Sequence, residues 1–245
     1  MIKVVFLLFL IGHVLADFYL QSSKLALEKN QFFRKLLKHC LIYMLTMIVI
    51  IIPIINLKLL QWAIIISLVH FSVDLIKFLL KNKFTFSHNI DISVFFIDQL
   101  LHLLTIIFAV VSILSVPIDY LGWIGEVIEQ SQIDLINVLS WVLIILTIIK
   151  PTSIIIRKVL FHYQPTNDNE SDGYPNAGAL IGILERLIIL LLLSVSQYSA
   201  IGFVLTAKSV ARHNKIADDP KFSEYYLLGT LLSSLLVITL YLMVF

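Results

Sequence analysis

Three pairs of histidine and aspartate lie inside long apolar runs of the sequence, where ionisable residues are rare. The two members of each pair are four positions apart, so on an α-helix they lie one turn apart on the same face. A carboxylate near the middle of a membrane costs about 2.5–3.5 kcal/mol, so three of them require compensating partners. Imidazole and carboxylate together suit zinc, manganese or iron. The pattern therefore predicts a site for a divalent metal, zinc or manganese, with the ligands His13, Asp17, His70, Asp74, Asp98 and His102.

The same residues suggest a reaction. A bound metal lowers the pKa of its water toward about 7 and makes it a nucleophile. We therefore expect a metal-dependent hydrolase that acts on a lipid-linked or phosphate-bearing substrate at the cytoplasmic leaflet, with Asp74, Asp98 and His102 at its catalytic centre. Three further residues are expected to orient these groups: Gln21, His39 and Gln99.

Two other interpretations fit the same pattern. An ion or proton relay, as in a transporter or channel, uses the same kinds of residue. Each aspartate could instead pair with its histidine and hold the bundle together, as in a membrane effector or scaffold. A bound metal with an open coordination position favours the hydrolase, and a continuous polar path to both faces favours transport.

A second polar group lies in the C-terminal half, where Glu185 and Arg186 stand inside an apolar run. Lys208 and Arg212 follow near the end of a shorter apolar segment. Cations held inside a bundle suit a phosphate or another anion, so these four residues are expected to bind an anionic substrate. The alternative is that Glu185 neutralises Lys208 or Arg212.

The composition identifies the elements that must position these residues. Hydrophobic residues make up 59% of the 245, the charged residues 14%, and the mean hydropathy is +0.96, which excludes a soluble globular protein. The net charge of +2 is too small to indicate a nucleic-acid partner, so membrane lipids are the expected surroundings. Runs this apolar and this long predict an all-α polytopic bundle. The expected spans number about eight: 4–20, 37–57 with a kink at Pro53, 60–80, 90–116, 135–149, 178–195, 198–211, which could be re-entrant, and 225–245.

Basic residues gather in the connections after the first, third, fifth and seventh spans, and cytoplasmic loops carry such an excess. This places both termini outside the cytoplasm. All three aspartates then lie nearer the cytoplasm than their histidines, at one depth. Residues 1–16 also have features of a signal peptide, but we interpret them as part of a retained first span. The expected parts are a four-helix membrane half at 1–117, an acidic extracytoplasmic loop at 118–134 and a second membrane half at 135–245, with a polar loop at 164–176.

The polar motifs also occur together as a set: Gly12 to Phe18 with Gln21, then His39, His70 to Asp74, and Asp98 to His102. This set resembles a family of bacterial integral membrane proteins, domain of unknown function 3307. The stretches 182–186, 200–202, 207–209 and 224–230 resemble the C-terminal half of its longer members. The resemblance implies a bacterial inner-membrane location and supplies no reaction. A looser likeness to membrane-bound metal-dependent hydrolases rests on ligand type alone and is an analogy.

Overall fold

The structure is a computed structural model that describes residues 1–54, 56–114, 117, 119–164 and 177–245. Within these ranges the secondary structure is helical and contains no strand, which confirms the all-α prediction. Most of the expected polar loop, 165–176, and the last two residues of the expected fourth span lie outside the described residues. The chain forms two compact units, Met1–Leu143 and Ile144–Phe245, and each is described by itself.

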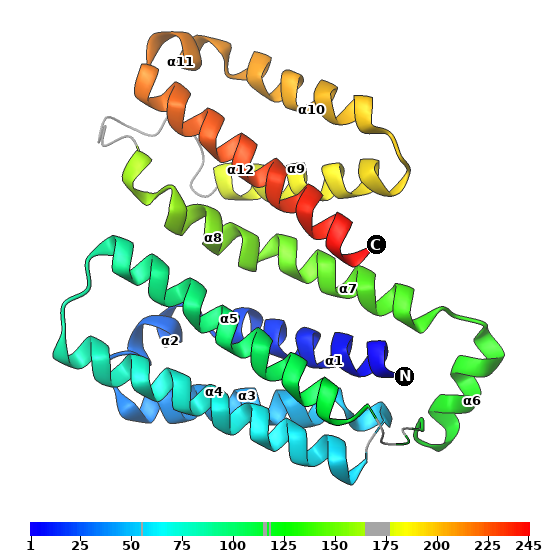
Figure 1. Ribbon diagram of the computed structural model, residues 1–245. Helices are drawn as coiled ribbons and strands as arrows, with labels where there is room; N and C mark the ends of the chain where they lie inside the picture. The colour runs from blue at the N-terminus through cyan, green and yellow to red at the C-terminus, as the bar shows by residue number, and fades with distance from the viewer. Residues whose placement is uncertain (55, 115–116, 118, 165–176) are drawn as a thin grey trace. The chain divides into compact units, whose positions relative to one another are not determined.

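Unit 1 is built on a bundle of four long helices (Figure 1). They are α1 (Ile2–Val14), α3 (Phe33–Ile50), α4 (Leu57–Lys83) and α5 (His88–Ser112). The helix α1 packs against α3 and α5, and α4 packs against the same two helices. Their shared core is purely apolar near the middle of the bundle, where Phe9, Met47, Ile66 and Ile106 are at most 2% exposed.

Short elements connect these helices and explain where they end. The π-helical turn η1 (Leu15–Tyr19) continues α1, and α2 (Ser23–Glu28) follows, capped by the Ser22 hydroxyl that accepts from the backbone of Leu25. The expected second span does not run to residue 57. Instead α3 ends at Ile50, because Pro53 cannot donate a helical hydrogen bond and lies in the short turn η2 (Ile52–Ile54). The expected acidic loop contains α6 (Gly122–Ser131).

Unit 2 contains the end of α7 (Leu135–Ile149), then α8 (Pro151–Val159) and the turn η3 (Phe161–Tyr163). Its remaining helices are α9 (Ala177–Ser194), α10 (Tyr198–Ala211), α11 (His213–Asp218) and α12 (Pro220–Val244). The helix α12 packs against α9 and α8, and α10 packs against α9. The pairing of α8, α9 and α12 brings the polar residues of this half together.

Six stretches of the described chain are helical, long and apolar enough to cross a membrane: Ile2–Tyr19, Leu57–Lys83, His88–Ser112, Leu135–Val159, Ala177–Ser194 and Pro220–Val244. The count differs from the expected eight at two places. The helix α3 carries Arg34, Lys35 and Lys38 near its start, which lowers its apolar character. The helix α10 has 14 residues, about 21 Å at 1.5 Å per residue, which is short of the roughly 30 Å of hydrocarbon. Large apolar side chains such as Leu68 and Phe108 stay exposed, as expected for helices that face lipid.

Candidate metal centre

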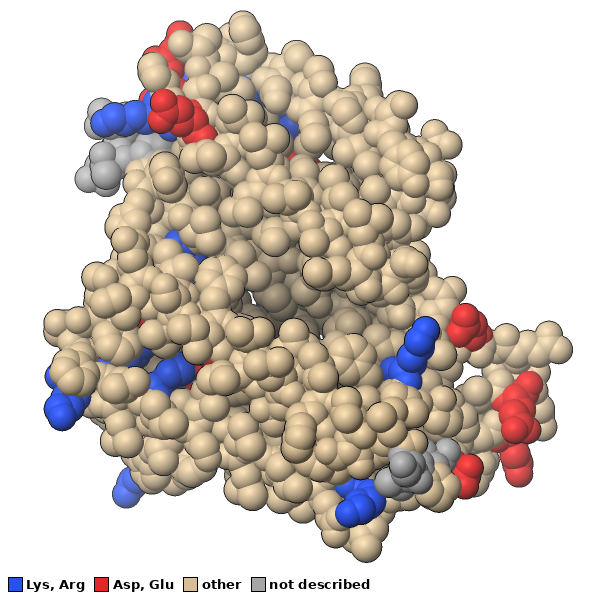
Figure 2. Space-filling view, in the orientation of Figure 1, with Lys and Arg blue, Asp and Glu red and all other residues tan. Residues whose placement is uncertain are grey.

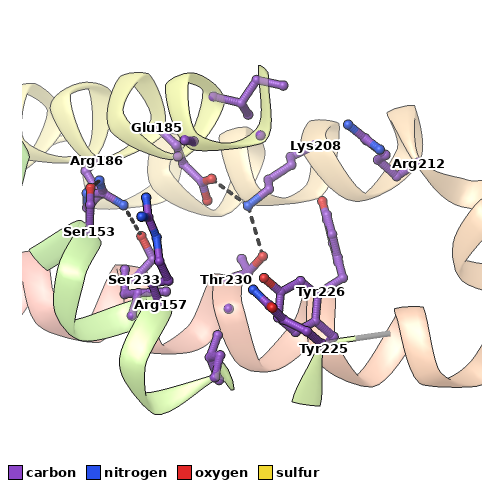
Figure 3. Close-up of a pocket in the computed structure, with 18 of the residues that line it drawn as sticks. Ser153, Arg157, Glu185, Arg186, Lys208, Arg212, Tyr225, Tyr226, Thr230 and Ser233 are labelled. Carbon is purple, nitrogen blue, oxygen red and sulfur yellow. Dashed lines mark hydrogen bonds and ion pairs between the residues drawn. The ribbon is translucent and has the colours of Figure 1, made fainter. Parts of the chain in front are cut away.

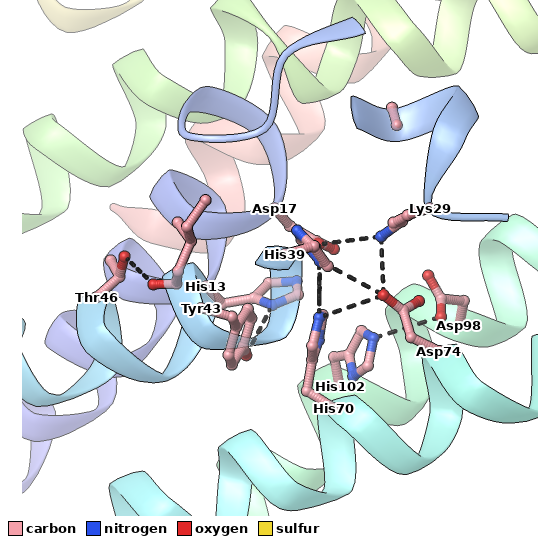
Figure 4. A network of polar contacts seen from close by, with 12 residues as sticks. His13, Asp17, Lys29, His39, Tyr43, Thr46, His70, Asp74, Asp98 and His102 are labelled. Carbon is pink, nitrogen blue, oxygen red and sulfur yellow. Dashed lines mark hydrogen bonds and ion pairs between the residues drawn. The ribbon is translucent and has the colours of Figure 1, made fainter. Parts of the chain in front are cut away.

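The bundle of unit 1 brings all six predicted metal ligands into one buried cluster (Figure 4). Within it, three sets each place one ligand atom from every member within 4.8 Å of the others. The sets are His13, Asp17 and His70; His39, His70 and Asp74; and Asp17, Asp98 and His102. Residues from four helices, far apart in the sequence, therefore converge in this cluster.

Four atoms form the centre of this cluster. His39 Nε2 lies 3.0 Å from His70 Nε2, 3.2 Å from Asp17 Oδ1 and 3.4 Å from Asp74 Oδ2. His70 Nε2 lies 3.8 Å from Asp17 Oδ1 and 3.6 Å from Asp74 Oδ2. All four side chains are at most 8% exposed. Ligands about 2.0–2.1 Å from a tetrahedral zinc ion lie about 3.3–3.4 Å from one another. The atoms of His39, His70 and Asp74 lie 3.0–3.6 Å from one another and so approach the spacing of a zinc site.

Asp17 reaches this centre from a widened turn of the first helix. Residues Leu15–Tyr19 form the π-helical turn η1, in which the backbone of Leu20 donates to the carbonyl of Leu15 over 2.8 Å. Such turns occur frequently at functional sites. The wider turn still leaves Asp17 and His13 in one potential ligand set.

Two lysines share the centre with the carboxylates, Lys29, which is buried, and Lys77, which is partly buried. Lys29 Nζ donates to Asp74 Oδ2 over 2.8 Å and lies 4.0 Å from Asp17 Oδ1. Lys77 Nζ donates to Asp74 Oδ1 over 2.8 Å and lies 2.9 Å from Asp98 Oδ1. With neutral histidines, the three aspartates and two lysines leave a net charge of −1. The carboxylates therefore have the compensating partners that the sequence predicted, and two lysines provide most of the charge balance without a metal ion.

His13 has a different environment from the two central histidines. Its Nε2 donates to Gln99 Oε1 over 3.2 Å, and its Nδ1 lies 3.1 Å from the hydroxyl of Tyr43. Both ring nitrogens therefore have partners. Gln99 also donates from Nε2 to Asp17 and Asp98, so it connects His13 to two of the three carboxylates. This arrangement fits the expectation that Gln99 orients ligands.

Of the remaining expected residues, His102 and His39 lie in the cluster. His102 Nε2 lies 3.4 Å from Asp98 Oδ1, and its ring centroid is 4.4 Å from that of His70. His39, expected to have a supporting role, is instead one of the four central groups and is fully buried. Gln21 Oε1 is buried without a hydrogen-bond partner in the described part of the chain, as are the Nδ1 atoms of His39 and His70.

Sequence reasoning missed three residues of the cluster: Lys29, Tyr43 and Lys77. Lys77 follows Asp74 by three positions and Tyr43 follows His39 by four, so helical spacing alone could have placed both on the polar faces. The ring of Tyr43 stacks on His70 with a centroid distance of 3.7 Å. Lys29 has no such signal, because it arrives from the end of α2, outside the helices that carry the pairs.

The second predicted group lies in unit 2 (Figure 3). Lys208 Nζ lies 2.5 Å from Glu185 Oε2 and 3.0 Å from the hydroxyl of Thr230. Arg186 donates to the carbonyl of Ile148 and to the hydroxyls of Ser153 and Ser233. Arg186 therefore connects helices α7, α8, α9 and α12, and the alternative pairing of Glu185 with Lys208 is present in the structure. Arg212 lines the same cavity as these residues.

The helices and the buried polar cluster define an all-α membrane protein with groups that could hold a metal ion. Residues 5–127 match the family described as protein of unknown function (DUF3307). The chain belongs to this family, and the matched region contains the complete His/Asp cluster. Comparisons with curated proteins and with solved structures find no match.

Proposed function

We propose that unit 1 is a membrane-embedded metal-binding module that holds one zinc-like divalent ion. The observation that carries the proposal is the convergence of two imidazole nitrogens, from His39 and His70, with one carboxylate oxygen each of Asp17 and Asp74. Each nitrogen lies 3.0–3.8 Å from the other nitrogen and from both oxygens. Mixed nitrogen and oxygen ligands of this kind suit zinc or manganese. A divalent ion would change the formal net charge of the three aspartates and two lysines from −1 to +1.

Lys29 does not exclude this site. A carboxylate oxygen has more than one lone pair, so Asp74 Oδ2 can accept from the ammonium group and bind an ion at the same time. An imidazole binds metal through an unprotonated nitrogen. The Nε2 proton that joins His39 to His70 would therefore leave when the ion binds.

Metal content after purification tests the proposal. We expect about one zinc per chain in the wild type, measured by mass spectrometry of the metal, and a large loss in Asp74→Asn. The matched control is Asp91→Asn, because Asp91 pairs with Lys81 outside the cluster and its replacement should leave the metal content unchanged. Circular dichroism establishes that both variants keep their helices. A wild type that contains no metal and gains no thermal stability from zinc or manganese would refute the proposal.

On this centre, the reaction that we propose is hydrolysis of a lipid-linked or phosphate-bearing substrate. The support is the position of Asp98 and His102, which lie beside the four central atoms and form a separate potential ligand set with Asp17. From there either group could accept a proton from a water molecule on the ion. His102→Gln should then abolish hydrolysis while zinc content remains near the wild-type value. Equal loss of zinc and activity would instead make His102 a ligand.

A proton path is the second candidate, and the neighbouring imidazole rings favour it. The ring centroids of His39 and His70 are 5.2 Å apart, those of His70 and His102 4.4 Å, and those of His102 and His13 5.2 Å. Chains of titratable groups inside membranes carry protons in many transporters. Proton flux into liposomes, lost in His70→Gln and unaffected by chelators, would support this function over hydrolysis.

We propose further that the protein lies in a bacterial inner membrane with both termini outside the cytoplasm. In unit 1, acidic side chains lie over α6, while basic side chains lie near α2 and the adjoining ends of the long helices and also, in smaller number, at the opposite end (Figure 2). Cytoplasmic segments carry the basic excess. In a chain whose single cysteine, Cys40, is replaced by serine, a cysteine in place of Lys83 should react only from the cytoplasm and one in place of Glu126 only from outside. The opposite labelling would reverse the orientation.

A further inference from the structure

Unit 2 contains a cavity of about 590 Å³ between α8, α9, α10 and α12. This volume lies within the range of small-molecule sites. One part of its lining is apolar and includes Ile156, Leu160, Ile181 and Phe222. The other part is polar and is shown in Figure 3.

The polar part of the cavity is strongly basic. Four cations line it, Arg157, Arg186, Lys208 and Arg212, against the single carboxylate of Glu185, so the formal balance is +3. Two of these cations already have partners within the protein. Arg186 donates to three oxygens. Lys208 pairs with Glu185, and its Nζ lies 5.0 Å from the centroid of the Tyr226 ring.

The other two cations are available to a ligand. Within the described ranges, the guanidinium groups of Arg157 and Arg212 form no hydrogen bond or ion pair, and both residues are exposed. A guanidinium group donates two parallel hydrogen bonds to a phosphate. One arginine comes from α8 and the other ends α10, so the two approach the cavity from different helices.

We propose that this cavity binds a phosphate-bearing amphiphile, with the phosphate in the polar part that Arg157 and Arg212 line and the apolar part along Ile156, Leu160 and Phe222. The proposal does not depend on the metal centre. It develops the sequence prediction of an anion site, but it moves the binding groups from Arg186 to Arg157 and keeps Arg212.

The buried carboxylate refines the ligand. Glu185 Oε2 is paired with Lys208, whereas Oε1 is buried without a partner in the described part of the chain, on a side chain only 5% exposed. An unpaired buried acceptor is costly, and a donor from the ligand removes this cost. A headgroup that carries a hydroxyl or amine beside its phosphate therefore fits better than a bare phosphate.

Glycine positions allow the cavity to be filled without changing its charges. A Cβ atom at Gly178, which lines the cavity, would meet nothing within 4 Å. Gly178→Leu should therefore place a bulky side chain in the space that the ligand needs. Gly202 is equally open but does not line this cavity, so Gly202→Leu is the matched control.

Native mass spectrometry of the full chain in detergent tests the proposal, with dioleoylphosphatidylglycerol, dioleoylphosphatidylcholine and inorganic phosphate as separate probes. We expect phosphatidylglycerol to bind, Arg157→Gln and Arg212→Gln each to weaken binding about tenfold or more, and Gly178→Leu to abolish it. The controls Arg34→Gln, an exposed arginine of unit 1, and Gly202→Leu should bind as the wild type does.

The three probes distinguish the sources of the phosphate. Binding of phosphatidylglycerol but not of inorganic phosphate identifies a lipid headgroup, whereas arginine-dependent binding of inorganic phosphate with similar affinity identifies a free phosphate or a soluble ester. The proposal is overturned if neither phospholipid binds or if the arginine variants behave like Arg34→Gln. Weaker binding of phosphatidylcholine, whose headgroup has no hydroxyl or amine donor, would support the contact with Glu185.

Discussion

Replacing Lys29 by methionine should change metal affinity and stability in opposite directions. The ammonium nitrogen lies 2.8 Å from Asp74 Oδ2, and an ion on that oxygen would lie about 2.1 Å from it, so the two cations would be at most about 5 Å apart. At an effective dielectric constant of about 20, the repulsion between charges of +1 and +2 at that distance is about 7 kcal/mol. The long lysine side chain can withdraw and relieve much of this repulsion. We therefore expect zinc to bind at least about tenfold more tightly to Lys29→Met, a gain of about 1.4 kcal/mol or more.

Without metal the same substitution removes one of the two cations that balance the buried carboxylates. Breaking a buried ion pair by removing one partner costs about 3–5 kcal/mol. Lys77 still contacts Asp74, so we expect the free energy of unfolding of the metal-free protein to fall by about 3 kcal/mol. Methionine retains most of the apolar length of lysine, which limits the effect to the loss of charge.

Two measurements follow the two effects: competition with a chromophoric chelator for zinc affinity, and thermal unfolding in the presence of a chelator for stability. Lys81→Met is the matched control, since Lys81 lies on α4, the helix that carries Asp74, and pairs with Asp91 outside the cluster. Its zinc affinity should equal that of the wild type. If Lys29→Met only destabilises the protein and its zinc affinity stays equal to that of the control, the proposed position of the ion is refuted.

Two further predictions concern other polar contacts of unit 1. Gln99→Leu should lower the free energy of unfolding by at least about 2 kcal/mol, because His13 and two carboxylates lose a hydrogen-bond partner. The control Gln61→Leu, at an exposed position of α4, should change the free energy of unfolding by less than about 0.5 kcal/mol. A hydrogen bond from Lys35 lowers the pKa of Glu28, a partly exposed residue of α2. Its stabilising effect is therefore present above its ordinary pKa and is lost as the pH falls through the lowered value. Lys35→Gln should raise the pKa of Glu28 in a carbon-13 titration of its carboxyl group, and an unchanged pKa would show that the pair is absent in solution.

The sequence predicted much of the cluster because helical periodicity and membrane thickness constrain depth. Pairs four residues apart share a helix face, and antiparallel helices with opposite residue order bring them to one level. For this reason His70, Asp74, Asp98 and His102 could be placed together before their contacts were visible. The same reasoning failed for Lys29, since a residue that reaches the centre from a short connecting helix has no periodic signal.

The number of spans was harder to predict, because α3 and α10 each meet only one of the two criteria for a span. The helix α3 is long enough but has a basic start, and α10 is apolar but short. The start of α3 is basic, yet the helix packs along α1 and α4 over the bundle. Pro53 ends the apolar stretch earlier than hydropathy suggests, because ring geometry rather than polarity stops the helix. In unit 2, no spacing rule distinguishes Arg186, with its three acceptors, from the unpaired Arg157, so pairing had to be observed.

The π-helical turn at Leu15–Tyr19 has a consequence for how this chain can vary. Such a turn accommodates one residue more than an α-turn, and each residue rotates an α-helix by about 100°. A deletion of Ala16 would leave the hydropathy of the first span almost unchanged. It would nevertheless convert the π-helical turn into an α-helical one, leave His13 and Asp17 three positions apart, and so move the carboxylate of Asp17 from its present place beside His39 and His70. In this part of the chain the number of residues between His13 and Asp17 is therefore under stronger constraint than the identity of the apolar side chains, so insertions and deletions should be far less tolerated than substitutions.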